Sequence, residues 1–155
     1  IGLNSLNIKK VTIIGRNESS LDIFIRSMRI LLSKKKILIE GVNNNKLNVS
    51  SYIEEADLII NTTPIGMNSK NNNQETIPLG NKIWACLSNK TILYDLIYTP
   101  RPTNWLKLGH QKNCFTIDGL DMLVEQGAFS IRLWSGFHDV PVQTMKSSAE
   151  KQLMV

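Results

Sequence analysis

The chain has 155 residues, of which 42% are hydrophobic and 20% are charged, and its formal net charge is +5. These values are typical of one soluble globular domain, and every apolar run is too short for a membrane-spanning helix. The first residues lack a signal-peptide pattern, so we expect a cytoplasmic location. The chain also begins without Met, and we interpret it as a fragment of a longer protein.

Cysteines, histidines and basic residues give no sign of metal or nucleic-acid binding. Cys86 and Cys114 do not have the spacing of a metal site, and we expect both to be reduced thiols. His110 and His138 are isolated from other metal-ligating residues. Positive charge is dispersed except at 34–36, a pattern typical of a helix end. We therefore expect no metal, no nucleic acid and no membrane as a partner.

Short β-branched runs alternate with segments of helical periodicity along the chain. The expected strands cover residues 11–14, 37–39, 56–61, 91–95 and 114–117. The expected helices cover residues 19–33, 49–55, 104–111, 120–134 and 140–155. Ser19-Ser20-Leu21-Asp22 resembles a capping box for the first helix, with Asp in place of Glu. Residues 68–74 are rich in Asn and predict a surface loop.

This alternation predicts an α/β fold, a Rossmann-like doubly wound parallel sheet with right-handed crossover helices. The strands are apolar, so we expect them to be buried on both faces. Trp84 and Trp105 are expected to pack in the core, and so are Phe129 and Trp134.

Gly15-Arg16-Asn17 follows the first expected strand. In dinucleotide-binding folds, an acidic residue near the adenosine ribose binds the 2′-hydroxyl of NAD, whereas an Arg accommodates the 2′-phosphate of NADP. Here the acid is absent and Arg16 is present, and Ser19 and Ser20 add neutral donors near a helix N-terminus. A turn with a solvent-exposed Arg would show the same residues, so this alternative stays open.

Three further groups of residues follow strand ends, where ligands bind in open α/β sheets. Residues 61–67, Asn-Thr-Thr-Pro-Ile-Gly-Met, combine small polar side chains with a Gly that lets a ligand approach the backbone. Tyr98 has a phenol that can donate to a carboxylate or hydroxyl. Asp118-Gly119 leads into a helix that carries Gln126. Each group alone is equally compatible with an ordinary structural role.

Together these motifs resemble the C-terminal, NADP-binding half of the shikimate dehydrogenase family. The family's Asn-Ala-Thr-Pro-x-Gly-Met appears at 61–67, its Asp-x-x-Tyr-x-Pro-x-x-Thr-x-x-Leu at 95–106, and its Gly-Leu-x-Met-Leu-x-x-Gln at 119–126. The Asn-Arg-Thr of its adenosine site appears as Gly15-Arg16-Asn17. Asp121 stands where the family usually has Gly.

The resemblance implies NADP as cofactor and reversible hydride transfer between NADPH and the carbonyl of 3-dehydroshikimate, in aromatic amino-acid biosynthesis. A small-molecule substrate is therefore the expected partner, and a homodimer is one possible assembly. The implied cofactor contacts are Gly15, Arg16, Asn17, Glu18, Ser19, Ser20, Asn61, Thr62, Thr63, Leu96 and Gly119. The implied substrate contacts are Tyr98 and Gln126.

The resemblance also implies what the chain lacks. The family's Gly-rich diphosphate loop, the central strand before it and the substrate domain with a catalytic Lys-Asp pair should precede Ile1, so we assign no catalytic residue here. We expect residues 1–118 to form a partial Rossmann domain and residues 119–155 to form helices that pack on the absent domain and are partly uncovered without it. Strands beside the missing one should lose ladder partners. We therefore expect the chain by itself to be marginally stable and inactive.

Two alternatives stay open. A quinate/shikimate-type paralogue or a glutamyl-tRNA reductase would share the fold and the cofactor, although Tyr98 and Gln126 favour a shikimate-type site. A non-catalytic nucleotide-binding or interaction fragment is the alternative from a different functional class. NADP-selective binding that depends on Arg16 would favour the dehydrogenase interpretation.

Overall fold

The chain folds as two compact units, unit 1 (Ile1–Tyr52) and unit 2 (Ile53–Val155). The computed structural model describes residues 7–45, 49–67 and 77–153, so the loop expected at 68–74 lies outside the described residues. The short helix α2 (Val49–Glu54) spans the boundary between the units. The domain boundary expected after residue 118 stays a prediction.

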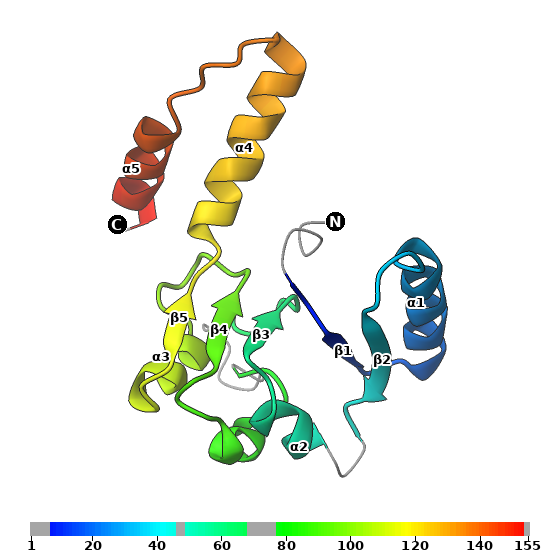
Figure 1. Cartoon of the computed structure of the whole chain (residues 1–155). Coiled ribbons are helices and arrows are strands. Elements are labelled where there is room, and N and C mark those ends of the chain that lie inside the picture. The colour runs from blue at the N-terminus through cyan, green and yellow to red at the C-terminus, as the bar shows by residue number, and fades with distance from the viewer. Residues whose placement is uncertain (1–6, 46–48, 68–76, 154–155) are drawn as a thin grey trace. The chain divides into compact units, whose positions relative to one another are not determined.

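Unit 1 is a strand–helix–strand unit (Figure 1). Strands β1 (Lys10–Gly15) and β2 (Leu38–Asn43) pair in parallel, from Lys10 opposite Leu38 to Gly15 opposite Asn43. Helix α1 (Glu18–Leu31) connects them and packs Leu21 and Ile25 against Ile39 of β2. Leu21 and Ile25 share one face of the helix because they are four residues apart.

The sequence predicted the N-cap of helix α1 at Ser19, but the N-cap lies two residues before it. The N-cap is Asn17, which has extended backbone angles and whose Oδ1 accepts a hydrogen bond from the backbone N of Ser20 at 2.9 Å. The prediction of a capping box at 19–22 is wrong, because Ser19 and Ser20 already lie inside the first turn. Asn is among the most favourable N-cap residues. Because Asn17 already accepts the hydrogen bond from Ser20 N, the helix begins before Ser19.

Unit 2 is built around three parallel strands in the order β3 (Leu58–Asn61), β4 (Ile92–Asp95) and β5 (Phe115–Ile117). A 3-10 helix η2 (Asn81–Cys86) precedes β4, and helix α3 (Asn104–Gln111) connects β4 to β5. Trp84 and Trp105 are both buried, with ring centroids 5.3 Å apart, as the sequence predicted.

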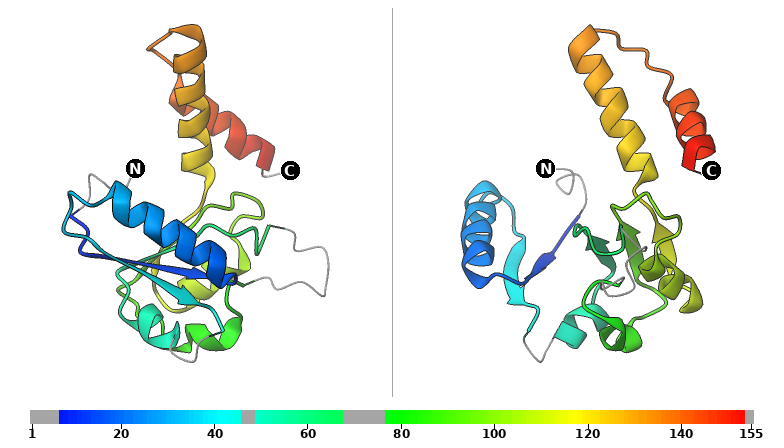
Figure 2. Two further views of the ribbon diagram at one scale, coloured as in Figure 1. Left: turned by 90° about the vertical axis from the view of Figure 1, so that its right-hand side faces the viewer. Right: turned by 180° about the vertical axis from the view of Figure 1, so that it is seen from behind.

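Two helices complete unit 2; they contact each other and lie side by side in the right-hand view of Figure 2. Helix α4 (Leu120–Ser135) ends at Gly136, which has a left-handed conformation with φ 73°, and α5 (Val142–Leu153) returns along it. Lys146 of α5 forms a 2.5 Å ion pair with Asp121 of α4. Val124 and Ala128 of α4 are buried.

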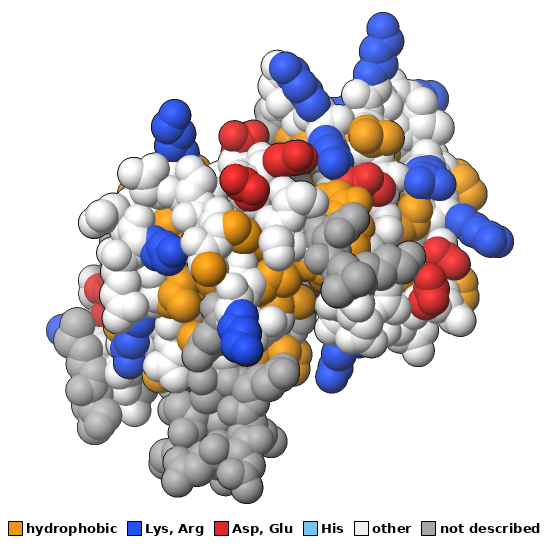
Figure 3. All heavy atoms as spheres, turned by 90° about the horizontal axis from the view of Figure 1, so that it is seen from below, with side chains coloured by type: hydrophobic (Ala, Val, Ile, Leu, Met, Phe, Trp, Pro, Cys, Tyr) orange, Lys and Arg blue, Asp and Glu red, His pale blue; other side chains and the backbone are white. Residues whose placement is uncertain are grey.

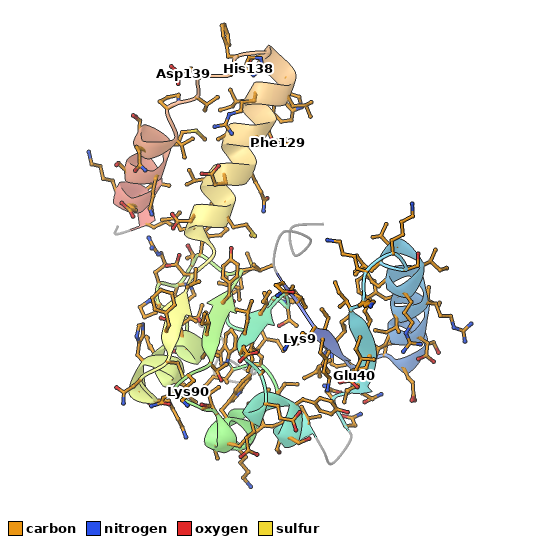
Figure 4. The ribbon with its side chains drawn as sticks, viewed as in Figure 1. Lys9, Glu40, Lys90, Phe129, His138 and Asp139 are labelled. Atoms are coloured by element: carbon orange, nitrogen blue, oxygen red, sulfur yellow. The ribbon has the colours of Figure 1, made fainter. Side chains whose placement is uncertain are left out.

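The outer face of α4 is uncovered. Trp134 is 82% exposed and Phe129, labelled in Figure 4, is 64% exposed. The prediction that these two residues belong to the core is therefore wrong, whereas the expectation of a partly uncovered helix is confirmed. Apolar residues on a helix bury only when another layer lies against them, and the structure shows no such layer over them within the described residues.

The strands in the described residues are all parallel, which confirms the predicted α/β class, but they pair as two sheets instead of one. Within the described residues, β1 pairs with β2 alone and β3 pairs with β4 alone, so each of these two strands has one unpaired edge. These unpaired edges match the expectation for strands that lack a central partner. Full burial on both faces does not hold for β4, because Leu93 and Asp95 share one buried face, whereas Ile92 and Tyr94 on the other face are half-buried. It is also wrong for β1, none of whose residues is fully buried.

Candidate functional site

The first group of predicted site residues lies in unit 1, where β1 ends and α1 begins. Arg16 and the residues from Asn17 to Ser20 are exposed. Neighbouring backbone holds this turn from the side of β2: Asn44 N donates to the carbonyl of Gly15 at 3.0 Å. The side-chain Nδ2 of Asn43 donates to the carbonyl of Arg16 at 3.4 Å. The Arg16 guanidinium is thus presented to solvent from an anchored turn.

This turn has the features of a phosphate site. A helix N-terminus carries partial positive charge and unpaired N–H groups, and an Arg beside it adds a full positive charge with several donors. Asn17 has a second role that the sequence did not reveal, because its Oδ1 is engaged as the helix cap. Only its amide NH2 group is the donor for a ligand. Glu18, in the first turn of α1, is the one acid of this stretch.

The second group lies in unit 2, where β3 ends at Asn61. The Asn61 side chain organises the loop that follows it. Its Oδ1 accepts hydrogen bonds from the backbone N and from the Oγ1 of Thr63, at 3.0 and 2.7 Å. Its Nδ2 donates to the carbonyl of Ile65 at 3.3 Å. Thr62 and Thr63 are both exposed, but the Thr63 hydroxyl is engaged within the loop, since it donates to Asn61 and accepts from Ile65 N at 3.3 Å.

Beside Asn61, at the end of β4, lies the fully buried Asp95. Its Oδ1 accepts from Asn61 Nδ2 at 3.0 Å and from the backbone N of Ile97 at 3.2 Å. Its Oδ2 accepts from Thr103 Oγ1 at 2.7 Å. Burial raises the pKa of Asp95 above its ordinary value, although the hydrogen bonds from Thr103, Ile97 and Asn61 act in the opposite direction.

Asp95 and Thr103 were not among the site residues predicted from the sequence. The available signal was their spacing in the motif at 95–106, in which an Asp ends a strand and a Thr caps the next helix. Thr103 does cap α3, since its Oγ1 accepts from Leu106 N at 3.3 Å.

Gly119 comes close to the end of β4. Its N donates to the carbonyl of Ile97 at 3.1 Å. A Cβ at this position would lie 2.0 Å from the carbonyl oxygen of Leu96, so no larger residue fits. Leu96 N in turn donates to the carbonyl of Asn61 at 3.1 Å. The structure thus brings Asn61, Leu96 and Gly119 together, and it explains the Gly by chain-to-chain packing.

The predicted substrate contacts are less tightly held. Tyr98 is half-buried in the connection after β4, and Gln126 is exposed on α4. No hydrogen bond joins these two side chains in the part of the chain that the structure describes. Arg101 Nε pairs with Asp118 Oδ2 at 2.6 Å, which links the Tyr98 segment to the start of α4. Asp121 is also paired, through Lys146.

Metal-ligating residues, apolar helices and surface charge indicate no further candidate site among the described residues. No group of three or more His, Cys, Asp or Glu residues suited to a metal ion occurs among the described residues. No described helix has the length and apolarity needed to cross a membrane. On the face drawn in Figure 3, Lys and Arg side chains are scattered among acidic and uncharged ones.

Comparison with known proteins places these features in a family. The model of the shikimate 5'-dehydrogenase C-terminal domain matches residues 119–150. A protein of Prochlorococcus marinus strain MIT 9312 named shikimate dehydrogenase (NADP(+)) is 43% identical over 152 residues, which cover 98% of this chain and 51% of that protein. A protein of the same name from Crocosphaera subtropica is 37% identical and is covered to 50%.

Over nearly its whole length the chain is similar to members of the shikimate dehydrogenase family. The resemblance drawn from the sequence motifs is therefore confirmed. The chain spans about half the length of the curated relatives it matches.

Solved structures of the same family agree with the fold. A shikimate dehydrogenase in complex with NADP+ aligns with a TM-score of 0.75 and 24% identity, covering 96% of this chain and 56% of that one. Quinate dehydrogenase from Corynebacterium glutamicum in complex with NAD aligns with a TM-score of 0.73 and 20% identity, covering 97% of this chain and 57% of that one. At these identities the likeness shows the fold alone.

Proposed function

We propose that this chain is the NADP-binding half of a shikimate dehydrogenase, which reduces 3-dehydroshikimate with NADPH in aromatic amino-acid biosynthesis. The observation that carries the proposal is the 43% identity, over 98% of the chain, to a protein named shikimate dehydrogenase (NADP(+)). Because the chain spans about half of such relatives, the activity is proposed for the whole protein.

The residues present fit NADP. The turn after β1 has an exposed Arg16 and lacks the acid that binds the 2′-hydroxyl of NAD. In this proposal Arg16, with Gly15, Asn17 and the first turn of α1, holds the 2′-phosphate. NADPH, when bound, supplies the hydride.

The remaining contacts are proposed from unit 2. Thr62 and Thr63, exposed on the loop that Asn61 organises, line the ribose and diphosphate of the cofactor. The backbone at Leu96 and Gly119 faces its nicotinamide. Tyr98 and Gln126 contact shikimate.

Titration of the chain with NADPH and with NADH tests the cofactor. We expect NADPH to bind at least about tenfold more tightly, a difference of roughly 1.4 kcal/mol, because only NADPH has a 2′-phosphate on its adenosine ribose for Arg16 to bind. Arg16→Ala should remove the preference. Arg26→Ala is the matched control, since it removes an exposed Arg from the body of α1.

Equal affinity for the two nucleotides in the unchanged chain would contradict the NADP assignment. Absence of binding to either nucleotide would favour the non-catalytic interaction fragment. The quinate/shikimate-type paralogue stays an alternative, and the cytoplasmic location, the homodimer and the inactivity of the chain by itself stay predictions.

A further inference from the structure

A buried carboxylate joins three segments of unit 2. Asp95, at the end of β4, has no exposed surface. It accepts hydrogen bonds from Asn61 at the end of β3, from the backbone of Ile97 just after β4, and from Thr103 at the start of α3. These donors come from separate stretches of the chain, so Asp95 fixes the distances between them.

Asn61 transmits this constraint to the surface. Its Nδ2 is held by Asp95, which orients the amide so that its Oδ1 faces the N and Oγ1 of Thr63. Thr63 is exposed, so its backbone N–H is sheltered from water by this hydrogen bond and not by burial. A continuous path of hydrogen bonds therefore runs from Thr103 through Asp95 and Asn61 to Thr63.

We propose that Asp95 is a positioning residue, which fixes the loop 61–65 and the segment 96–103 relative to one another. The proposal rests on the proposed function, because these two stretches carry the expected cofactor contacts Thr62 and Thr63 and the expected substrate contact Tyr98. Asp95 acts through Asn61 and Thr103 and is not itself assigned a contact with a ligand.

The chemistry of a carboxylate suits this role. An ionised carboxylate only accepts hydrogen bonds and has two oxygens, so it can take all three donors at once. Hydrogen bonds to a charged acceptor are shorter and stronger than neutral ones, and the Thr103 bond is 2.7 Å. Away from water, each donor lost from such a network leaves the others less constrained.

Removal of the Thr103 hydroxyl tests the network from the end opposite Thr63. Thr103→Val keeps the shape of the side chain and deletes the donor to Asp95, and Thr103→Ser restores the donor. Thr91→Val is the matched control, because Thr91 is equally buried and its Oγ1 donates to the carbonyl of Ala56 at 2.8 Å, before β4 begins. The measurements are amide hydrogen exchange at Thr63 and Ile97, and NADPH affinity, all in the full chain.

We expect Thr103→Val to speed exchange at both amides by about fivefold, the factor for one typical hydrogen bond, and to weaken NADPH binding. Thr103→Ser should restore both readings, and Thr91→Val should change neither. Loss of the α3 cap alone does not predict faster exchange at Thr63, because that amide donates to Asn61 and not to a group of α3.

Several outcomes would overturn the proposal. They are unchanged exchange at Thr63 in Thr103→Val, an equal change in Thr91→Val, or an unprotected Thr63 amide in the unchanged chain. If Thr103→Val does not fold, Asp95→Asn replaces it and must also speed exchange at Thr63, because the amide puts a donor where Thr103 needs an acceptor. If the unchanged chain binds no NADPH, the proposed function fails, while the exchange measurements still decide the positioning role.

Discussion

Single residues decide how closely the segments of the candidate site approach one another. Gly119 and Asp95 are the two positions where the structure allows little choice. Gly119 permits the backbone of α4 to meet the carbonyl of Leu96, and Asp95 collects donors that would otherwise be buried without partners. Neither role involves an exposed surface, since both residues are buried.

At Gly119, we expect Ala to destabilise unit 2 by roughly 3 kcal/mol, the upper range for overpacking, because its Cβ would lie 2.0 Å from a backbone oxygen that no rotamer can move. Urea unfolding followed by Trp fluorescence measures the change. Gly127→Ala is the control in the same helix: its Cβ would meet only the flexible end of Met145. There Ala should be neutral or should stabilise by up to about 1 kcal/mol through helix propensity. Equal effects of the two substitutions would refute this account of Gly119.

At Asp95, we expect stability to depend on pH. The folded state raises the pKa of this carboxyl above its ordinary value of 3.8, chiefly through burial. The folded state therefore binds the Asp95 proton more tightly than the unfolded state does. This proton's contribution to the free energy of unfolding is complete below pH 3.8 and is lost as pH rises through the higher, folded-state pKa.

Urea unfolding at a series of pH values, for the unchanged chain and for Asp95→Asn, measures this effect. As pH rises from 3.8 through the folded-state pKa of Asp95, the free energy of unfolding of the unchanged chain should fall relative to that of the variant. Glu40, whose pKa is lowered mainly by its hydrogen bond with Lys10, gives the opposite slope but is present in both proteins, so it cancels. A constant difference between the two proteins would show that the folded state does not perturb Asp95.

At the scale of elements, hydrophobic periodicity predicted the helices well, although the cap predicted for α1 was wrong. The expected bounds of α3, 104–111, are those observed, because Thr103 is a strong cap and its side chain does cap the helix. Strand β2 extends to Asn43, beyond the expected end at 39. Its pairing with β1 continues to Gly15, and ladder length depends on the partner strand as well as on the strand's own residues.

Residues at strand ends could be predicted as site candidates because the position of a motif relative to a strand is visible in the sequence. The Asp95 network could not, because its donors are 2, 8 and 34 residues away in the chain. The exposure of Trp134 could not be predicted either, since it depends on what covers α4.

Helix α1 depends on a cap that also belongs to the predicted phosphate site. We expect Asn17→Ala to destabilise unit 1 by about 1 kcal/mol through loss of the side-chain hydrogen bond to Ser20. Asn17→Asp should keep the cap and suit the helix dipole, yet weaken NADPH binding by charge repulsion. Hydrogen exchange of the α1 amides and NADPH titration separate the two effects. If Asn17→Asp bound NADPH as tightly as the unchanged chain, Asn17 would be a cap alone.

At the scale of the whole molecule, each unit has its own core and its own sheet. Unit 1 packs α1 on β1 and β2 around Leu21, Ile25 and Ile39. Unit 2 has Trp84 and Trp105 at the centre of its core. All the Trp residues of the chain lie in unit 2, so Trp fluorescence reports on that unit.

We expect Ile25→Ala to unfold unit 1 selectively. Truncation of this buried side chain should cost about 3 kcal/mol, a large fraction of what a small unit has to lose. Urea unfolding followed by circular dichroism should show an early loss of helix, while the transition seen by Trp fluorescence stays in place. Simultaneous shifts of both transitions would show that the units unfold as one.

The connection between α4 and α5 has a consequence for how the chain can be cut. Gly136, Phe137, His138 and Asp139 are all exposed, and Figure 4 shows His138 and Asp139 outside both helices. Exposed connections are preferred sites of proteolysis, and Phe137 offers an aromatic side chain to chymotrypsin. Helix α5 has no buried residue. A single cleavage at Phe137 should therefore release α5 as a peptide and leave the sheet of unit 2 intact.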